Sequence, residues 1–272
     1  LIIEGLRPLN KHIRTLPGLA DMARGQSDYG QLNELDINDL LAREPSVADE
    51  ALLQSQVTDQ VVLVTGAGGS IGSELCRQVL QRKPKTLLLF DLSELALYTL
   101  NNELQKILCQ LSQAESVGFS GEQNQGRASE NNSGNINLMP RIVPLLGSVT
   151  DENRVSDVIS TWRPSIIYHA AAIKHVPIVE QNIAECVKTN IFGTLVMAKV
   201  AIEWQVDRFI LVSTDKAVNP TNAMGASKRC CELILQALAA EVNPAFEPLL
   251  GGQTSGYVEH KMKLAIVRFG NV

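Results

Sequence analysis

The sequence predicts an α/β fold in which a doubly wound parallel sheet carries helices on both faces. From about residue 58 onward, short apolar runs of strand length alternate with helix-length stretches. The runs are continuously apolar, which is typical of strands covered on both faces. A glycine-rich turn separates the first run from the first helix-length stretch, a junction common in such sheets. Together these observations indicate one large α/β core.

The individual elements follow in chain order. Aliphatic and β-branched residues form the expected strands, at residues 61–64, 86–90, 142–146, 166–169, 209–212 and 264–267. Helical spacing marks the expected helices, at residues 70–82, 94–113, 151–162 and 227–240, with a long helical region ending near residue 204. Because helices separate the strands, neighbouring strands are expected to pair in parallel.

The rest of the chain is interpreted as connector and insertions. Residues 1–57 lack the strong alternation, so we interpret them as an N-terminal connector arm with a short helical turn at 35–41. Residues 58–272 form the predicted dinucleotide-binding domain, interrupted by two flexible insertions near residues 112–137 and 243–260. Both chain ends look cut, so we expect a longer parent protein and a truncated C-terminal substrate part.

Composition limits the classes of binding partner and the location expected for this chain. The 272 residues carry a formal net charge of −5, which argues against nucleic acid or a membrane surface as partner. No apolar run reaches the roughly 18 residues that span a bilayer. The five cysteines show neither a CxxC pair nor metal-ligand spacing, so no metal site is expected. Scattered thiols favour the reducing cytoplasm as the location of this segment.

The glycine turn predicts a dinucleotide site. Its spacing brings backbone amides and the following helix N-terminus against a pyrophosphate. Asp91 lies 19 residues beyond the last glycine, where an acid binds the ribose 2′-hydroxyl. Residues 91–102 contain no Arg or Lys to bind a 2′-phosphate, so NAD is favoured over NADP. The candidate cofactor-binding residues of this part are Gly66, Gly68, Gly69, Ser70, Ile71, Gly72 and Asp91.

Other strand ends are expected to complete the cofactor site, because ligands of such sheets bind beyond the carboxyl ends of the strands. Small residues after the fourth strand fit a close approach to the nicotinamide end. After the third strand, the chain has Ser148 where many relatives have an Asp that meets the adenine. The further candidates are Ser148, Val149, Ala170, Ala171, Ala172, Asn190 and Lys228.

Three motifs carry a family resemblance. They are Lys-His-Val-Pro at residues 174–177, Ser-Thr-Asp-Lys-Ala-Val-Asn-Pro-Thr-Asn at 213–222 and Met-Gly-Ala-Ser-Lys at 224–228. Together they resemble the UDP-N-acetylglucosamine 4,6-dehydratases of polysaccharide biosynthesis, the CapD-like family of extended short-chain dehydrogenases/reductases. The resemblance covers roughly residues 58–272 without the two insertions, and residues 1–57 also look like the connector of large, membrane-anchored members.

The resemblance implies roles for single residues. Asp215 would be the acid for the departing hydroxyl, with a raised pKa, and Lys216 the base at sugar carbon 5, with a lowered one. Thr214 would bind the carbon-4 oxygen, and Lys228 the nicotinamide ribose. Met224 stands at the usual tyrosine position and cannot take a proton, as in large members of the family. The expected substrate contacts are Lys174, His175 and Asn271, with a solvated loop equally open for the first two.

The implied reaction converts UDP-N-acetylglucosamine to a UDP-4-keto-6-deoxy-N-acetylhexosamine for bacterial surface glycans. Hydride passes from carbon 4 to NAD and returns to carbon 6 after loss of water. The parent protein is expected to be a homo-oligomer anchored in the inner membrane. The fragment alone is expected to bind NAD and could lack turnover. Two alternatives stay open: a nucleotide-sugar 4-epimerase or dehydrogenase, and a non-catalytic nucleotide-binding module.

Overall fold

The computed structural model describes residues 14–15, 33–34, 49–118, 139–240 and 262–270. The chain divides into two compact units, Leu1–Asp49 and Glu50–Val272. In the first unit, β1 (Arg14–Thr15) pairs antiparallel with β2 (Asn33–Glu34). The helical turn predicted at 35–41 lies outside the described residues.

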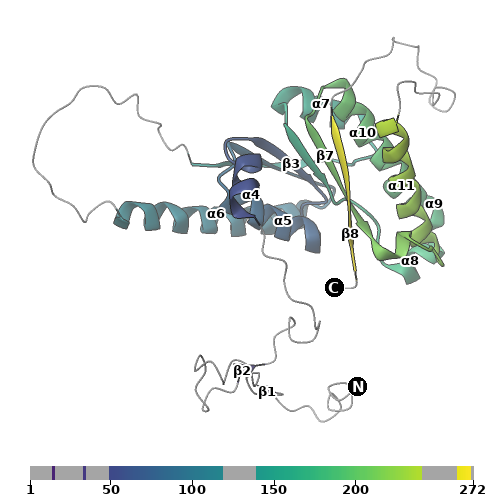
Figure 1. The fold of residues 1–272 in the computed structure, drawn as a ribbon, viewed down its shortest axis with the longest axis horizontal. Helices are drawn as coiled ribbons and strands as arrows, with labels where there is room; N and C mark the ends of the chain where they lie inside the picture. The colour runs from purple at the N-terminus through teal and green to yellow at the C-terminus, as the bar shows by residue number, and fades with distance from the viewer. Residues whose placement is uncertain (1–13, 16–32, 35–48, 119–138, 241–261, 271–272) are drawn as a thin grey trace, which may run out of the picture. The chain divides into compact units, whose positions relative to one another are not determined.

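A six-stranded parallel sheet forms the centre of the second unit (Figure 1). All of its described pairings are parallel, in the spatial order β5-β4-β3-β6-β7-β8. The chain winds outward from β3 in one direction and returns to β6 to wind outward in the other. The predicted doubly wound fold is confirmed. The strands are β3 (Val61–Thr65), β4 (Thr86–Asp91), β5 (Arg141–Leu146), β6 (Ile166–His169), β7 (Arg208–Thr214) and β8 (Lys263–Phe269).

Helices cover both faces of this sheet. One face packs against helices α4, α5 and α6, and the other against α7, α10 and α11. Successive strand residues point to opposite faces, so Val62 and Val64 join the first core and Leu63 the second. The helix bounds are α4 (Glu50–Val57), α5 (Ser70–Gln81), α6 (Glu94–Gly118), α7 (Glu152–Trp162), α10 (Gly193–Glu203) and α11 (Ala223–Ala240).

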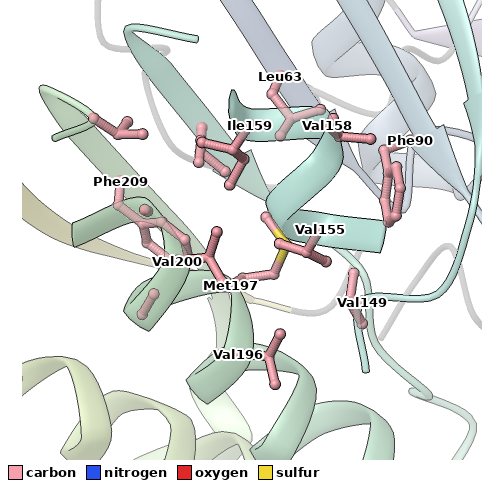
Figure 2. Close-up of a cluster of buried hydrophobic side chains, with 14 of the residues drawn as sticks. Leu63, Phe90, Val149, Val155, Val158, Ile159, Val196, Met197, Val200 and Phe209 are labelled. Atoms are coloured by element: carbon pink, nitrogen blue, oxygen red, sulfur yellow. The ribbon is translucent and has the colours of Figure 1, made fainter. Parts of the chain in front are cut away.

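The second core joins strands β3, β4, β6 and β7 to helices α7, α10 and α11. Figure 2 shows Leu63, Phe90 and Phe209 from three strands meeting Ile159 of α7 and Met197 of α10. All five side chains are at most 1% exposed. Burial of each contributes roughly 1.5–3 kcal/mol. This packing fixes the strand ends from which the candidate site residues extend.

Several elements differ from the sequence prediction. Helix α6 runs five residues beyond the predicted end, into the expected insertion. Helix α11 begins four residues before the predicted start because Asn222 caps it, with its Oδ1 accepting from Gly225 N at 2.8 Å. Helix α4 lies inside the predicted connector, where Val57 joins the first core. None of the helices in the described part of the chain is long and apolar enough to cross a bilayer.

The predicted long helical region is broken into four pieces. They are α8 (Val176–Gln181), α9 (Ile183–Cys186), a π-helical turn η2 (Val187–Phe192) and α10. Asn182, with φ −138°, separates the first two pieces. π-turns are rare and frequently lie at functional sites. Here the π-turn carries Asn190, one of the predicted site residues.

Candidate functional site

The glycine turn packs directly against the end of β6, where the winding of the sheet reverses. Gly66 has φ +65°, and a Cβ there would lie 2.6 Å from the Ala171 Cα. Ala170 N donates to Thr65 O at 3.1 Å, so the two strand ends stay in register beyond the sheet. A Cβ on Gly72 would overlap the Gly66 carbonyl oxygen. The turn therefore requires glycine at positions 66 and 72 for its own closure.

The turn is also tied to the predicted ribose-binding acid. Asp91 Oδ2 accepts from Gly68 N at 2.9 Å, and Oδ1 accepts from Ser93 N at 2.9 Å. The first helical bond of α5 runs from Ser73 N to Gly69 O. The amides of residues 70–72 thus have no partner within the helix. A half-buried carboxylate beside these amides fits a dinucleotide, with the pyrophosphate at the helix N-terminus.

The segment after β5 offers backbone rather than side chains. Gly147 is confined between Phe90 and Arg154, since a Cβ would lie 2.7 Å from the Phe90 ring and 2.9 Å from Arg154 Cγ. The Ser148 hydroxyl is already paired with Thr150 Oγ1 at 2.8 Å. Val149 is buried in the core. Ser148 and Val149 are the two predicted cofactor contacts of this segment. Because the Val149 side chain is buried, Val149 could contact the cofactor only through its backbone.

Asn190 joins three elements of the site. Its Oδ1 accepts from Ile173 N at 2.8 Å, and its Nδ2 donates to Ile173 O at 3.0 Å and to Ser227 Oγ at 2.9 Å. The side chain is completely buried. The predicted cofactor contact of Asn190 stays a prediction, since its side chain is enclosed by protein in this structure. The side chain holds the loop that follows Ala172 against α11.

Asn190→Ala should lower the free energy of unfolding by about 2 kcal/mol, because two backbone groups of Ile173 lose their partner. Chemical denaturation measures the change. The matched control is Asn182→Ala, whose amide donates only to the exposed Ile178 O at 2.9 Å. This control should change stability by less than about 0.5 kcal/mol. Equal losses for both variants would contradict the bridging role of Asn190.

The buried His169 connects β3, the strand before the glycine turn, to the π-turn through Thr194. His169 Nδ1 lies 2.8 Å from Thr65 Oγ1, and Nε2 lies 3.0 Å from Thr194 Oγ1. The Thr194 hydroxyl donates to Asn190 O at 2.6 Å, so it must accept from His169 Nε2–H. Thr65 then donates to the unprotonated Nδ1. Every hydroxyl in this chain of hydrogen bonds donates in the same direction.

Burial lowers the pKa of His169 to about 3, with the positive charge of Lys228 as a second cause. The unfolded histidine titrates near its ordinary pKa of 6.5. The neutral ring therefore contributes full stability above about pH 6.5, and this contribution is lost as the pH falls toward 3. The slope is at most roughly 1.4 kcal/mol per pH unit. Urea denaturation from pH 3.5 to 7 should show a shallower decline for His169→Gln than for the wild type. Parallel profiles would contradict this assignment.

Lys228 and Met224 occupy successive turns of α11. The Lys228 ammonium is buried and donates to Val212 O at 2.9 Å, and burial lowers its pKa. Met224 is also buried, in a small apolar cluster with Val179 and Cys186. A methionine sealed in such a cluster has no path for proton transfer. The structure therefore brings the lysine to the end of β7 and leaves position 224 as packing.

Thr214, Asp215 and Lys216 follow at the carboxyl end of β7. The Thr214 hydroxyl donates to Asp215 Oδ1 at 3.0 Å, and Lys216 Nζ lies 3.5 Å from the same oxygen. These contacts hold the pKa of Asp215 below its ordinary value, and the hydrogen bond from Thr214 is the largest cause. The predicted raised pKa of Asp215 is wrong for this arrangement, because the carboxylate is exposed and hydrogen-bonded. A Cβ on Gly225 would lie 2.6 Å from Lys216 O, so α11 packs on this turn.

The predicted substrate contacts lie apart. Lys174 Nζ donates to Ser70 Oγ at 3.4 Å, across the N-terminus of α5. This places Lys174 beside the glycine turn. His175 is exposed at the N-cap of α8. Asn271 lies outside the described residues. Among the described residues, no cluster of three or more His, Cys, Asp or Glu could hold a metal ion.

Sequence reasoning missed a buried carboxylate. Glu232 is completely buried on α11 and accepts from Ser213 Oγ at 2.7 Å and from Arg268 Nε at 2.8 Å. The arginine on β8 holds the pKa of Glu232 down, at about 2. The sequence did carry a signal for Glu232, because it lies one helical turn after Lys228 and therefore on the same, core-facing side of α11. The ion pair fixes α11 to β8, and the hydrogen bond from Ser213 fixes α11 to the residue that precedes Thr214.

Comparisons with known proteins identify several relatives of this chain. The polysaccharide biosynthesis protein family matches residues 62–119 and 107–272. The capsular polysaccharide biosynthesis protein CapD of Staphylococcus aureus is 35% identical over 94% of this chain and 35% of its own length. An inverting UDP-N-acetylglucosamine 4,6-dehydratase of Campylobacter jejuni is 30% identical over 65% of this chain and 42% of its own length.

Two further relatives extend the comparison. A UDP-glucose 4-epimerase of Rickettsia bellii is 29% identical over 79% of this chain and 49% of its own length. The solved structure of Pen from Bacillus thuringiensis superimposes with a TM-score of 0.58 at 27% identity, covering 79% of this chain and 51% of that one. The chain thus spans between a third and about half the length of these proteins.

Proposed function

The chain belongs to the polysaccharide biosynthesis protein family, and from this premise we propose that it is the NAD-binding part of a UDP-N-acetylglucosamine 4,6-dehydratase. One observation carries the proposal: Thr214, Asp215 and Lys216 stand together at the end of β7, next to the strand end that packs on the glycine turn. The buried Met224 supports dehydration, because the superfamily's usual proton-transferring tyrosine is replaced there.

NAD is the dinucleotide that fits this chain. When bound, it supplies a reversible hydride acceptor. The amides of residues 70–72 would hold its pyrophosphate, and Asp91 the adenosine ribose. Lys228 would hold the nicotinamide ribose with its buried ammonium. The 170–172 alanines leave room at the end of β6, and Asn190 and His169 keep that loop in place.

Asp215 can serve two proton-transfer steps in sequence. Its lowered pKa leaves it ionised at rest, so it can accept the proton of the sugar carbon-4 hydroxyl, directly or through water. The same proton then leaves with the carbon-6 hydroxyl as water. Lys216 takes the proton from carbon 5 and returns it there when carbon 6 is reduced, while Thr214 binds the carbon-4 oxygen. This cycle replaces the missing tyrosine without a net change in protonation.

The test uses the full-length enzyme with UDP-N-acetylglucosamine. We expect a product lighter than the substrate by one water, with a carbonyl at carbon 4 by NMR. A product isobaric with the substrate would overturn the proposal and favour a 4-epimerase, the second candidate, which the likeness to the rickettsial epimerase supports. Thermal shifts with NAD and UDP-sugar but no turnover would favour the non-catalytic module. The homo-oligomeric, inner-membrane-anchored parent remains a prediction.

A further inference from the structure

We propose that the amino edge of the parallel sheet is a docking surface for anionic phospholipid headgroups. This edge lies at the opposite ends of the strands from the candidate site. We call it the basic edge and define it by the cations at or just before the strand starts, Lys85, Arg141, Arg163, Arg208 and Lys263. The net charge of −5 hides this surface, because its members lie far apart in the sequence.

The sheet register brings these cations into a row. Arg141 N donates to Lys85 O at 3.1 Å, which aligns the starts of β5 and β4. Arg208 N donates to Ser165 O at 3.1 Å and Lys263 N to Asp207 O at 2.8 Å, which aligns β6, β7 and β8. Neighbouring strands are about 4.8 Å apart, so the row extends over roughly 24 Å. Figure 1 shows the starts of β7 and β8 at the end opposite to α8.

The cations of the row are presented to solvent. Lys85, Arg141, Arg163 and Lys263 are exposed, and Arg208 is half-buried. Among the described residues of this edge, the exposed carboxylates are Asp59, Asp207 and Glu203, which precedes Trp204. Positive charge therefore exceeds negative charge along the row. Each Lys or Arg near an anionic membrane strengthens binding about fivefold.

Both tryptophans of the chain lie at the same edge. Trp162 ends α7 and Trp204 follows α10, and both are half-buried. The guanidinium carbon of Arg141 lies 4.9 Å from the Trp162 ring centroid, and that of Arg163 lies 4.3 Å from the Trp204 centroid. Indole rings and cationic side chains together are typical of the membrane–water interface. The pairing also supplies a spectroscopic reporter for contact at this edge.

The same geometry favours a lipid surface over nucleic acid. The two rings are covered by guanidinium groups rather than open for stacking of bases. The shortest central strand, β6, spans four residues, or about 13 Å at 3.3 Å per residue. Docking would therefore leave the glycine turn and Asp215 pointing away from the bilayer.

The test is sedimentation of the 272-residue chain with vesicles of phosphatidylcholine alone or with phosphatidylglycerol added. We expect binding only to the anionic vesicles, loss of binding in high salt, and a change in tryptophan emission on binding. Lys85→Glu with Lys263→Glu should weaken binding about 25-fold or more. Lys188→Glu with Lys199→Glu makes the same charge change at exposed lysines elsewhere and should retain binding.

Three results would overturn the proposal. They are equal binding to neutral vesicles, equal weakening by the two double variants, and tighter binding to DNA than to anionic vesicles. NAD affinity, measured on the same samples by calorimetry, should be unchanged by either double variant. This readout separates failure of the lipid surface from failure of the proposed function, because the two lie at opposite edges of the sheet.

Discussion

Gly72→Ala is expected to lower NAD affinity at least a hundredfold and to destabilise the domain by about 3 kcal/mol. The added Cβ would overlap the carbonyl oxygen of Gly66, and neither backbone segment can retreat. Gly66 itself is pressed on Ala171 at the end of β6. Relief of the clash would have to open the turn or move α5, and both changes displace the amides of residues 70–72. The added cost is the overpacking penalty of a tight core, typically 1–3 kcal/mol or more.

Gly69→Ala is the matched control, three residues earlier in the same turn. A Cβ there would lie 3.2 Å from the same carbonyl oxygen, a separation that a shift of a few tenths of an ångström relieves. Calorimetric titration with NAD and urea denaturation measure both variants. We expect Gly69→Ala to stay within tenfold of wild-type affinity. Comparable losses of NAD affinity and stability in Gly69→Ala and Gly72→Ala would show that the clash with the Gly66 carbonyl oxygen is not the cause.

Asp215→Asn and Lys216→Met are each expected to reduce turnover of the full-length enzyme by about 10²–10⁴-fold, the range of general acid–base catalysis. The two losses should differ in kind. Without the lysine base, the carbon-5 proton should not exchange with deuterated solvent. An asparagine can neither accept the carbon-4 proton nor return it to the leaving hydroxyl, so oxidation and water loss both stop. Mass spectrometry of the products distinguishes the two variants, because Lys216→Met should still form the 4-ketone without loss of water, whereas Asp215→Asn should leave the substrate unchanged.

NAD affinity controls for folding in both variants, because neither side chain supports the glycine turn. Lys188→Met supplies the same substitution at an exposed lysine on the π-turn and should retain turnover. Wild-type exchange at carbon 5 in Lys216→Met would show that another group is the base. Full activity in Asp215→Asn would contradict the proposed two-step proton transfer, since a side-chain amide cannot accept and return a proton as a carboxylate does.

The strands were predictable because burial on both faces leaves a direct mark on the sequence. The run Val62–Val64 and its counterparts in β4 and β6 consist almost wholly of apolar residues, so their positions agree to within one or two residues. The cofactor turn was predictable for a similar reason, since glycine alone fits position 66 with its positive φ. Helix ends were less certain, because capping by Asn222 depends on a side-chain orientation that composition does not reveal.

Long-range side-chain contacts were not predictable. Asn190 and Ile173 are 17 residues apart, and their pairing depends on a π-turn, for which the sequence carries no recognisable period. The lowered pKa of Asp215 likewise depends on the Thr214 hydroxyl pointing at its carboxylate. Glu232 and Arg268 are separated by 36 residues and meet only after β8 joins the sheet. Each of these features is set by tertiary geometry.

In a parallel sheet, every connection that runs from a helix into a strand enters at the amino edge. The connections from α6 to β5 and from α11 to β8, through residues 119–138 and 241–261, are both of this kind. The candidate site residues lie instead on connections that run from a strand into a helix, at the carboxyl edge. Substitutions in one set of connections can therefore accumulate without altering the side chains that the other set brings together.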